Sequence, residues 1–552
     1  INTIPSVSLS ESNLTDGSAA SNAPVSQTET IQFTNQSDDV VKFRIDPAQF
    51  NPNDTLKSNG LVVELKADPN TTGAYIGFVK DGANPEVPVF TISFSTSTVG
   101  EYTFTLLEAL DHADGQAKND LSFELPVFAV DRDGDDSLMS PLKVTVSDDV
   151  QGMQNQTLSI TEPTVADLAA GVVTTGTVDV MPNQSADGAT ITQFTYDNNV
   201  YTLVQGTTGE QVFPVAEGKL YITLEGDVRF EPNRNLNHSG GDIVKTITVM
   251  SEDKDGDEVT STVTLTISDG APPVIDNIPP VALAEANLLD GTSPSITVTQ
   301  TGTMTFTSGS DDVNHFRIDT AQFNTTGDLK SDGLVVKLKE DPLNSDNYIG
   351  FVENGGVQTD IFTITFDSLV LGQYTFTLLE ELDHLPVQGN NVQIFTLPVI
   401  AVDQDNTDSV IKPLTVTITD DVPVITDTTV ASTFVVDEDD LGSVVAQATG
   451  SFVTTEGADQ VEVYELRNVA TLETTLTSGN EAISITEVTG AANTTTYQGA
   501  TTSGTPIFTL ALGNDGSYTF TLLGPLNHAT GSNDLTIPFN VVAVDGDGDD
   551  SN

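Results

Sequence analysis

The sequence YTFTLL occupies residues 102–107 and returns unchanged at 374–379 and 518–523. Its threonines alternate with aromatic or aliphatic residues, a period of two that is typical of a β-strand with one buried face. A second pair of copies supports the repetition, because FRID at 43–46 recurs at 316–319. Internal repetition on this scale predicts that one β-domain occurs several times along the chain.

A short acidic loop follows each copy of this strand and also a divergent copy that begins VRFEP at residue 228. The loops are DRDGDD at 131–136, DKDGDE at 253–258, DQDNTD at 403–408 and DGDGDD at 545–550. The repetition predicts four domains. They are β-sandwich repeats at 1–150, 273–422 and 423–552, the last cut off before its final strand, and a divergent β-sandwich repeat at 151–272.

The fold class that this pattern predicts is all-β. Turn-rich segments separate the predicted strands roughly every 8–12 residues, and no stretch keeps a helical period over three turns, although a short helical turn is expected at 164–170. We therefore expect four tandem immunoglobulin-like, or cadherin-like, antiparallel β-sandwiches. Their linkers are very short and two of the three contain proline, so an end-to-end rod of roughly 150 Å is expected.

The chain has 552 residues with 80 Asp and Glu against 19 Lys and Arg, a formal net charge of −61. Such a surface repels phosphate backbones and anionic lipids, so nucleic acid and membrane surfaces are poor partners and cations are good ones. Cysteine is absent, which excludes disulfides, thiolate nucleophiles, Cys-ligated zinc and iron–sulfur clusters. No apolar run reaches 18 residues, so no direct membrane insertion is expected.

The two ends of the sequence also carry an expectation. The first residues, INTIPSVSLS, lack the basic and apolar regions of a secretory signal peptide. The last residues stop inside a motif that continues in the earlier copies. We therefore interpret the sequence as an excerpt of a longer chain, whose targeting signals lie outside it.

The acidic loops carry the chemistry that the sequence predicts. Asp131, Asp133 and Asp135 stand at alternate positions beside Gly134, which allows a sharp turn. Calcium needs six to eight oxygen ligands, and a tight Asp-rich turn supplies several from one segment. The same spacing recurs in two further loops, at Asp253, Asp255 and Asp257 and at Asp545, Asp547 and Asp549.

Topology predicts where other carboxylates join these loops. In a sandwich of this type the loop before the last strand lies at the end where the chain enters, facing the acidic C-terminal end of the preceding domain. Each domain also has an acidic residue early in its expected first strand, at Glu11, Glu162, Glu285 and Glu438. An early loop adds further acids, which are Asp38 and Asp39, Asp187, Asp311 and Asp312, or Asp459. We expect a first junction of Asp148, Asp149, Glu162, Asp253, Asp255 and Asp257, a second of Asp269, Glu285, Asp403 and Asp405, and a third of Asp420, Asp421, Glu438, Asp545, Asp547 and Asp549.

The expected cofactor is Ca²⁺, as several ions held mainly at the domain junctions, because so many carboxylates in one seam repel one another without a cation. Magnesium is disfavoured, since it seldom uses cages made wholly of protein ligands. The third loop departs from the others at Asn406 and Thr407, which predicts a weaker site there. The alternative is that these loops are ordinary solvated turns.

The histidines raise the alternative of a repeated metal ligand or catalytic dyad. His112, His238, His384 and His528 occupy one repeat position, each preceded by Asp or Asn. Because each copy lies in a separate domain, they cannot converge on one site, and we expect a structural hydrogen bond. The sequence also lacks a P-loop, HExxH, GxSxG and a GxGxxG after a strand. No enzyme is predicted.

Taken together, YTFTLL, the DxDGDD loops and the acidic strand ends resemble the tandem extender domains of RTX-type giant bacterial adhesins, which are exported by type I secretion. The resemblance covers nearly the whole chain and is weakest in the second domain. It implies a calcium-stiffened extracellular stalk on the bacterial cell surface, anchored at the outer membrane through parts outside this sequence. Such a stalk projects a ligand-binding tip in cell adhesion and biofilm formation, and its partners are neighbouring repeats of the same chain.

Two other functions stay open on the sequence. In the first alternative, one domain, foremost 151–272, is itself a ligand- or cell-recognition module whose surface is lined by residues 191–203 (ITQFTYDNNVYTL). In that case an exposed aromatic patch or a side pocket is expected there. The other alternative is a stalk attached to a secreted hydrolase.

Overall fold

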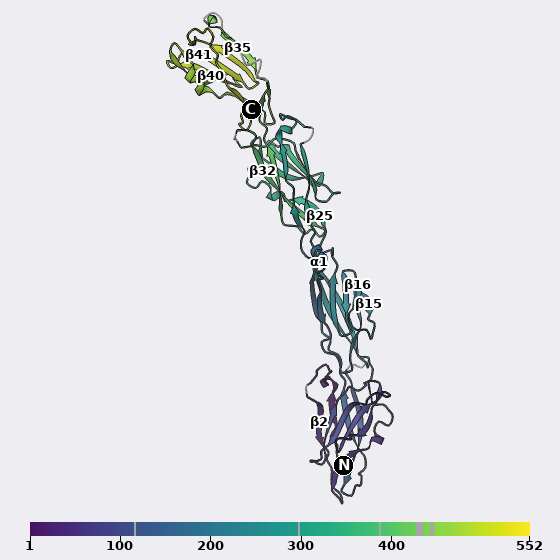
Figure 1. The fold of residues 1–552 in the computed structure, drawn as a ribbon. Helices are drawn as coiled ribbons and strands as arrows, with labels where there is room; N and C mark the ends of the chain where they lie inside the picture. Colours follow the sequence, from purple (N-terminus) through teal and green to yellow (C-terminus); the bar gives the residue numbers. More distant parts are fainter. Residues whose placement is uncertain are drawn as a thin grey trace. The chain divides into compact units, whose positions relative to one another are not determined.

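A computed structural model describes residues 1–21, 23–114, 118–295, 298–385, 388–426, 434–441 and 446–551. The chain forms two compact units, Ile1–Ala271 and Pro272–Asn552. Regular structure in both is nearly all β, which confirms the predicted fold class, and Figure 1 shows the strands as arrows. The fold is a series of immunoglobulin-like antiparallel β-sandwiches, because pairs of sheets enclose separate cores.

The first repeat of the first unit is a sandwich of two sheets. One sheet has the order β1 (Val7–Ser10), β11 (Ser140–Ser147), β10 (Asp120–Asp131) and β3 (Val40–Ile45). The other has the order β2 (Val25–Thr30), β9 (Glu101–Leu106), β8 (Val87–Phe94), β7 (Ala74–Val79) and β6 (Glu64–Ala67). A small hairpin joins β4 (Lys57–Ser58) to β5 (Leu61–Val62). The YTFTLL strand is β9, and its Tyr102 and Phe104 are fully buried.

One pairing in this repeat positions the site. β1 runs parallel to the last strand, β11, with Val7 opposite Val144 and Ser10 opposite Ser147. The residues that follow these two strands therefore lie side by side at the C-terminal end of the repeat. Glu11 follows β1 in the 3-10 helix η1 (Glu11–Asn13), and Asp148 follows β11.

The second repeat of the first unit has the same two layers. Its sheets have the orders β12 (Gln156–Thr161), β20 (Glu258–Ser268), β19 (Ile243–Glu252), β14 (Thr190–Tyr196), β15 (Asn199–Thr202), and β13 (Gly176–Asp179), β18 (Asp227–Pro232), β17 (Gly218–Ile222), β16 (Gln211–Val215). The expected helical turn is α1 (Val165–Ala170). It begins at a capping box between Thr164 and Asp167 and ends at Gly171, whose φ of +69° suits glycine.

The second unit begins with a repeat whose sheet topology closely resembles that of the first repeat. Its main sheets have the orders β22 (Val281–Ala284), β33 (Lys412–Thr419), β32 (Val392–Asp403), β25 (Val313–Ile318), and β23 (Thr299–Thr303), β31 (Gln373–Leu378), β30 (Val357–Phe366), β29 (Asn344–Asn354), β28 (Lys337–Asp341). Two small sheets pair β21 (Val274–Asn277) with β24 (Thr305–Thr307), and β26 (Lys330–Ser331) with β27 (Leu334–Val335). β22 again runs parallel to the last strand, β33.

The last repeat has one large sheet in the order β35 (Ala446–Ser451), β42 (Ser517–Leu522), β41 (Pro506–Gly513), β40 (Thr494–Thr501), β39 (Glu481–Val488), β38 (Thr477–Ser478). Two smaller sheets pair β37 (Val461–Leu466) with β43 (Val541–Asp545), and β34 (Val424–Ile425) with β36 (Thr454–Thr455). Helix α2 (Val469–Thr475) packs beside β39. The remaining 3-10 helices are η2 (Pro47–Gln49), η3 (Glu285–Asn287), η4 (Thr320–Gln322) and η5 (Glu438–Asp440).

Each repeat has its own hydrophobic core, built from the inward face of its strands. The four cores fall within the four repeats expected from the sequence, whose limits at residues 150, 272 and 422 stay predictions. Across each junction within a unit, one alanine of the following repeat packs on the preceding core: Ala186 in the first unit and Ala458 in the second. In the described part of the chain, no helix is long and apolar enough to cross a membrane.

Candidate cation-binding clusters

Within the first unit, buried carboxylates gather where the two repeats meet. Relative exposure is 9% or less for every member. The members are Glu11, Asp148 and Asp149 of the first repeat and Asp187, Asp253, Asp255 and Asp257 of the second. Asp and Glu are almost never fully buried unless they are paired, so a seam of this kind favours a bound counter-charge.

Six of these carboxylates, together with His112, form three overlapping triads. In each triad one ligand atom per residue lies within 4.8 Å of the others, a spacing that a single metal ion can span. The triads are Glu11, His112 and Asp148; Asp148, Asp187 and Asp255; and Asp253, Asp255 and Asp257. Asp148 and Asp255 each belong to two of them, so the two repeats share their ligand atoms.

The second repeat presents its acidic loop through local hydrogen bonds. The backbone N–H of Asp257 donates to Oδ1 of Asp253 at 2.8 Å, and Gly256 turns the chain with a φ of +89°. Gln151 then fixes the loop to the entry of the repeat, because its Nε2 donates to the carbonyl oxygen of Asp257 at 3.0 Å. This placement agrees with the topological expectation that the loop faces the preceding repeat.

Several carboxylate oxygens of this cluster contact no hydrogen-bond donor among the described residues. They are both oxygens of Asp255, Oδ2 of Asp148, Oδ2 of Asp253 and Oε2 of Glu11. Burial raises the pKa of Asp148 to about 7 and, together with the charge of Glu11, the pKa of Asp187 to about 8. Burial and the adjoining Asp255 raise the pKa of Asp253 to about 8. These oxygens are buried without a hydrogen-bond donor from the described residues, which costs free energy unless a cation binds.

Histidine belongs to this cluster, a contact that sequence reasoning missed. Nε2 of buried His112 lies 3.3 Å from Oε1 of Glu11, and its Nδ1 lies 2.9 Å from Oδ1 of Asn119. Burial opposes the charged imidazole, but the hydrogen bond and charge of Glu11 outweigh it and raise the pKa of His112 to about 9. The His position thus holds the repeated Glu in place. The signal in the sequence was that both residues recur once in every repeat.

The second unit contains a corresponding cluster between its two repeats. Its members are Glu285, Asp420 and Asp421 of one repeat and Asp459, Asp545, Asp547 and Asp549 of the next. Glu285, His384 and Asp420 form a triad of the same kind as Glu11, His112 and Asp148. The backbone N–H of His384 donates to Oδ2 of Asp547 at 3.1 Å, which ties the acidic loop to the preceding repeat.

Several carboxyl groups of this second cluster also have raised pKa values and oxygens without a donor among the described residues. Asp420 is fully buried, and neither of its side-chain oxygens meets a donor among the described residues. Burial and the neighbouring Asp549 raise the pKa of Asp420 to about 8. Burial and the charge of Glu285 raise the pKa of Asp459 to about 10, and burial with the adjoining Asp547 raises that of Asp545 to about 7.

Two of the predicted ligands have a different set of contacts. Oδ2 of Asp149 accepts from the backbone N–H of Ser18 at 2.7 Å and from that of Ala186 at 3.0 Å. Asp421 accepts in the same way from Thr292 and Ala458. Each of these aspartates therefore links the backbones of two successive repeats by hydrogen bonds, independently of any cation.

The expected grouping of the opening glutamates was wrong. Glu162 does not lie with the 253–257 loop: it follows β12, which runs parallel to β20, and therefore lies at the opposite end of that strand. There it accepts from the backbone N–H of Leu236 at 3.0 Å and lies 3.1 Å from Nε2 of His238. Glu285 likewise lies at the C-terminal end of its own repeat, against His384, and Glu438 lies against His528.

The physical reason for this error is the strand pairing. The first strand of each complete repeat joins the last strand in parallel, so a residue after the first strand meets the acidic tail of its own repeat. The correct member of the first cluster is Glu11 and that of the cluster in the second unit is Glu285. Asp187 and Asp459, expected in early loops of their repeats, lie in the same clusters.

The remaining predicted ligands lie outside these two clusters. The first-repeat loop is exposed: Asp131 Oδ1 accepts from the backbone N–H groups of Asp133, Gly134 and Asp135, at 3.0–3.1 Å. Asp403 is buried and caps its own loop, accepting from Asp405 and Thr407. Asp269 follows β20 in the first unit. The expected junction of Asp269 with Asp403 and Asp405 joins the two units and stays a prediction.

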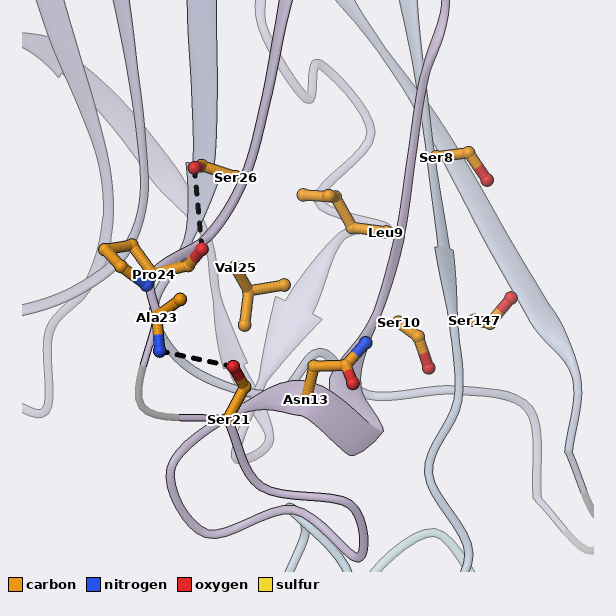
Figure 2. Close-up of a pocket in the computed structure, with 10 residues that line it drawn as sticks. All are labelled: Ser8, Leu9, Ser10, Asn13, Ser21, Ala23, Pro24, Val25, Ser26 and Ser147. Atoms are coloured by element: carbon orange, nitrogen blue, oxygen red, sulfur yellow. Dashed lines mark hydrogen bonds between the residues drawn. The ribbon is translucent and has the colours of Figure 1, made fainter.

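A hollow of about 470 Å³ opens beside the edges of the two sheets of the first repeat (Figure 2). Its lining is neutral. It consists of Ser8, Leu9, Ser10, Asn13, Ser21, Ala23, Pro24, Val25, Ser26 and Ser147. Among these residues there is no carboxylate, histidine or base, so the hollow offers neither a strong metal ligand nor an acid–base pair.

The aromatic side chains of the segment proposed as a recognition surface pack in the core of the second repeat, whereas residues 197–200 and 202 are exposed. Ile191, Phe194, Tyr196 and Leu203 are buried. Tyr201 stacks on Phe194 at a ring-centroid distance of 4.7 Å, so it packs on the core. The aromatic side chains of this segment therefore form part of the hydrophobic core and not an exposed patch.

No protein-family model matches this chain, and no curated protein matches it. Among solved structures it is similar to a tetra-tandem repeat from the extending region of a large adhesion protein, at 12% identity over 90% of this chain and 96% of that one, with a TM-score of 0.23. A Ca²⁺-stabilised, ice-binding adhesin of an Antarctic bacterium has 12% identity over 100% and 99%, with a TM-score of 0.23. Extracellular cadherin domains 1–4 of protocadherin gamma B7 have 16% identity over 86% and 93%, with a TM-score of 0.22.

Similarities at this level leave the function to be argued from the side chains.

Proposed function

We propose that this chain is a calcium-rigidified extender region of a large secreted bacterial surface adhesin. The observation that carries the proposal is the seam of buried carboxylates between successive repeats, with Asp255 and Asp420 as its central members. Both oxygens of each contact no donor among the described residues although the side chains are at least nine-tenths buried. A divalent cation at these positions turns mutual repulsion into a link between two repeats.

The chemistry of the donor set fits calcium. Apart from one histidine in each cluster, the candidate ligands are carboxylate oxygens, which hard cations prefer. They come from several chain segments in two repeats, and calcium accepts six to eight oxygens in flexible geometry, whereas magnesium keeps its waters and needs a strict octahedron. Calcium would supply positive charge here, and no reaction is implied.

The proposed ligand set follows from the clusters. In the first unit it comprises Glu11, Asp148, Asp187, Asp253, Asp255 and Asp257, and in the second Glu285, Asp420, Asp459, Asp545, Asp547 and Asp549. Asp131, Asp133 and Asp135 are proposed as a weaker site, because their exposure leaves the carboxylates hydrated. Glu162, Asp269, Asp403, Asp405 and Glu438 stay proposed ligands of the further junctions.

The role as a stalk rests on three observations. The repeats follow one another with short linkers, Asp149 and Asp421 tie successive backbones together, and the acidic motifs resemble those of RTX-type adhesin extenders. Extracellular calcium modules bind at about 10⁻⁴–10⁻³ M. Binding of that strength stiffens a junction outside the cell and leaves it unclamped at cytoplasmic calcium levels, which suits export by type I secretion. Attachment and biofilm formation are the proposed setting.

Isothermal titration of the full chain with calcium, after extensive chelation, tests this proposal. We expect several sites with Kd values of about 10⁻⁴–10⁻³ M and much weaker heats with magnesium. Small-angle scattering of the same samples measures the stalk role: the profile becomes more flexible in EGTA. Absence of calcium binding at 10 mM would overturn the proposal.

A further inference from the structure

The two acidic loops at the junctions within the units have the same backbone geometry. In the first unit the N–H of Asp257 donates to Oδ1 of Asp253 at 2.8 Å, and in the second Asp549 donates to Oδ1 of Asp545 at 2.7 Å. Their glycines adopt φ values of +89° and +96°. The second position differs, because Lys254 stands where the other loop has Gly546.

Lys254 brings a positive charge to the rim of the first junction. Its Nζ donates to Oδ1 of Asn59 in the preceding repeat at 2.8 Å. Glu108 lies within electrostatic reach of the same ammonium: burial and the charge of Asp16 raise the pKa of Glu108, and Lys254 opposes that shift. The rim of this junction thus contains two carboxylates, one amide and one ammonium.

The rim in the second unit is more negatively charged. The repeat alignment places Asp290 at the position of Asp16, Asp332 at that of Asn59, Glu380 at that of Glu108, and Glu381 at that of Ala109. Burial raises the pKa of Glu381 to about 7, with further contributions from Asp332, Glu380 and Asp290, so these four acids sense one another. With Gly546 in place of Lys254, these four positions carry four carboxylates and, since the pKa of Glu381 is about 7, a charge between −3 and −4 at neutral pH.

We propose that the two junctions bind their cation with unequal affinity and that the junction of the second unit binds it more tightly. In the absence of the cation, Lys254 partly holds the junction of the first unit together. This inference rests on the proposed function. The rim groups named above carry a charge of −1 at the first cluster and between −3 and −4 at the second. Each added negative charge some 8–10 Å from a divalent ion strengthens binding by about threefold to fivefold at low ionic strength.

A graded response follows from this difference. A difference of two to three unit charges, at threefold to fivefold each, predicts a calcium affinity roughly tenfold to a hundredfold higher at the junction of the second unit. As calcium rises, that junction becomes rigid first and the first junction follows at higher concentration. At low calcium the bond from Lys254 to Asn59 keeps the first junction the more protected of the two.

Hydrogen–deuterium exchange of the full chain, read by mass spectrometry across a calcium titration in 10 mM KCl, separates the two junctions. Peptides that cover residues 148–152 report on the first, and peptides that cover 420–424 report on the second. Lys254→Ala removes the rim cation, with the exposed Lys143→Ala on β11 as the control of equal charge. Gly546→Lys adds one, with Gly546→Ala as its steric control, because a Cβ there lies 3.1 Å from the carbonyl oxygen of Asp459.

The expected result is a calcium midpoint at 420–424 at least about tenfold below that at 148–152. K254A lowers only the first midpoint by about threefold to fivefold, K143A changes neither, and G546K raises only the second relative to G546A. Equal midpoints in the wild type, or a first midpoint unmoved by K254A, overturn the inference while leaving calcium binding intact. If neither junction gains protection with calcium, the proposed function itself fails.

Discussion

The loops at 131–135 and 253–257 have the same spacing of three aspartates around a glycine, yet only one of them lies in a cluster. Their backbones match, with Gly134 and Gly256 at φ values of +92° and +89°. Asp133 is exposed, whereas its counterpart Asp255 is 7% exposed and faces Glu11 and Asp148 of the preceding repeat. The motif therefore builds a turn, and a neighbouring repeat converts that turn into a candidate site.

Removal of calcium is expected to have the largest effect on this comparison. At calcium concentrations tenfold to a hundredfold above Kd, each site adds about 1.4–2.7 kcal/mol to the free energy of unfolding. We expect EGTA to lower the Tm of the chain by about 5–15 °C and to raise hydrogen exchange at 148–152, while exchange at 131–136 changes little. Magnesium in place of calcium is the control. Equal deprotection of the two loops would show that burial does not distinguish them.

Replacing one carboxylate in each loop sharpens the comparison further. Asp255→Asn removes a charge shared by two triads, so we expect calcium affinity at the first junction to fall by roughly tenfold to a hundredfold. The same variant raises the Tm in EGTA, because one uncompensated buried charge is gone. Asp133→Asn is the matched control: it removes a charge from the exposed loop and is expected to change calcium affinity at the first junction by less than about twofold and to leave the Tm in EGTA nearly unchanged. Calorimetric titration and thermal unfolding measure both, and equal losses in the two variants would contradict the proposal.

Lower pH is expected to stabilise the metal-free first junction. The folded-state pKa values of Asp148, Asp187 and Asp253 are raised to about 7, 8 and 8, against about 4 in an unfolded chain. The folded state therefore binds more protons between pH 4 and 8, and in EGTA stability falls as pH rises through this window. The pKa of His112, raised to about 9, acts in the same direction.

Thermal unfolding at pH 5 and pH 8, with and without calcium, measures this effect. We expect the metal-free chain to be more stable at pH 5 by several degrees, and the calcium-dependent gain in Tm to be larger at pH 8, where the carboxylates are ionised. The Asp255→Asn variant should show a smaller pH dependence in EGTA. A metal-free chain that is most stable at pH 8 would contradict the raised pKa values.

The sequence was sufficient to predict the all-β fold, the helical turn before Ala170 and the position of the 253–257 loop near the entry of its repeat. Alternation and Asp/Gly turns are local signals, and local signals decide strands and turns. The sequence was not sufficient to place Glu11 beside Asp148. That neighbourhood depends on a parallel pairing between the first and last strands, which lie more than a hundred residues apart and carry no local mark of their partner.

The same reason explains the missed histidine. His112 was expected to make a structural hydrogen bond, and it does contact Asn119. Its other ring nitrogen lies against Glu11, far away in sequence, because β1 brings that residue to the end of the sandwich at which the loop after β9 lies. Recurrence of a Glu and a His once per repeat was visible in the sequence, but only the strand pairing joins them.

The smallest expected effect separates turn formation from cation binding within the exposed loop. Oδ1 of Asp131 accepts three backbone N–H groups, so Asp131→Ala leaves those donors to water and loosens the turn. We expect a loss of about 0.5–2 kcal/mol, as for removal of a helix N-cap, because the same kind of side-chain acceptor is lost. The loss should be nearly equal in calcium and in EGTA, since this carboxylate acts mainly on its own loop. Asp131→Asn, which retains an acceptor oxygen, should lose less. If the loss from Asp131→Ala instead grows strongly with calcium, the exposed loop binds the ion as the buried one is proposed to do, and the difference between the two loops is one of degree.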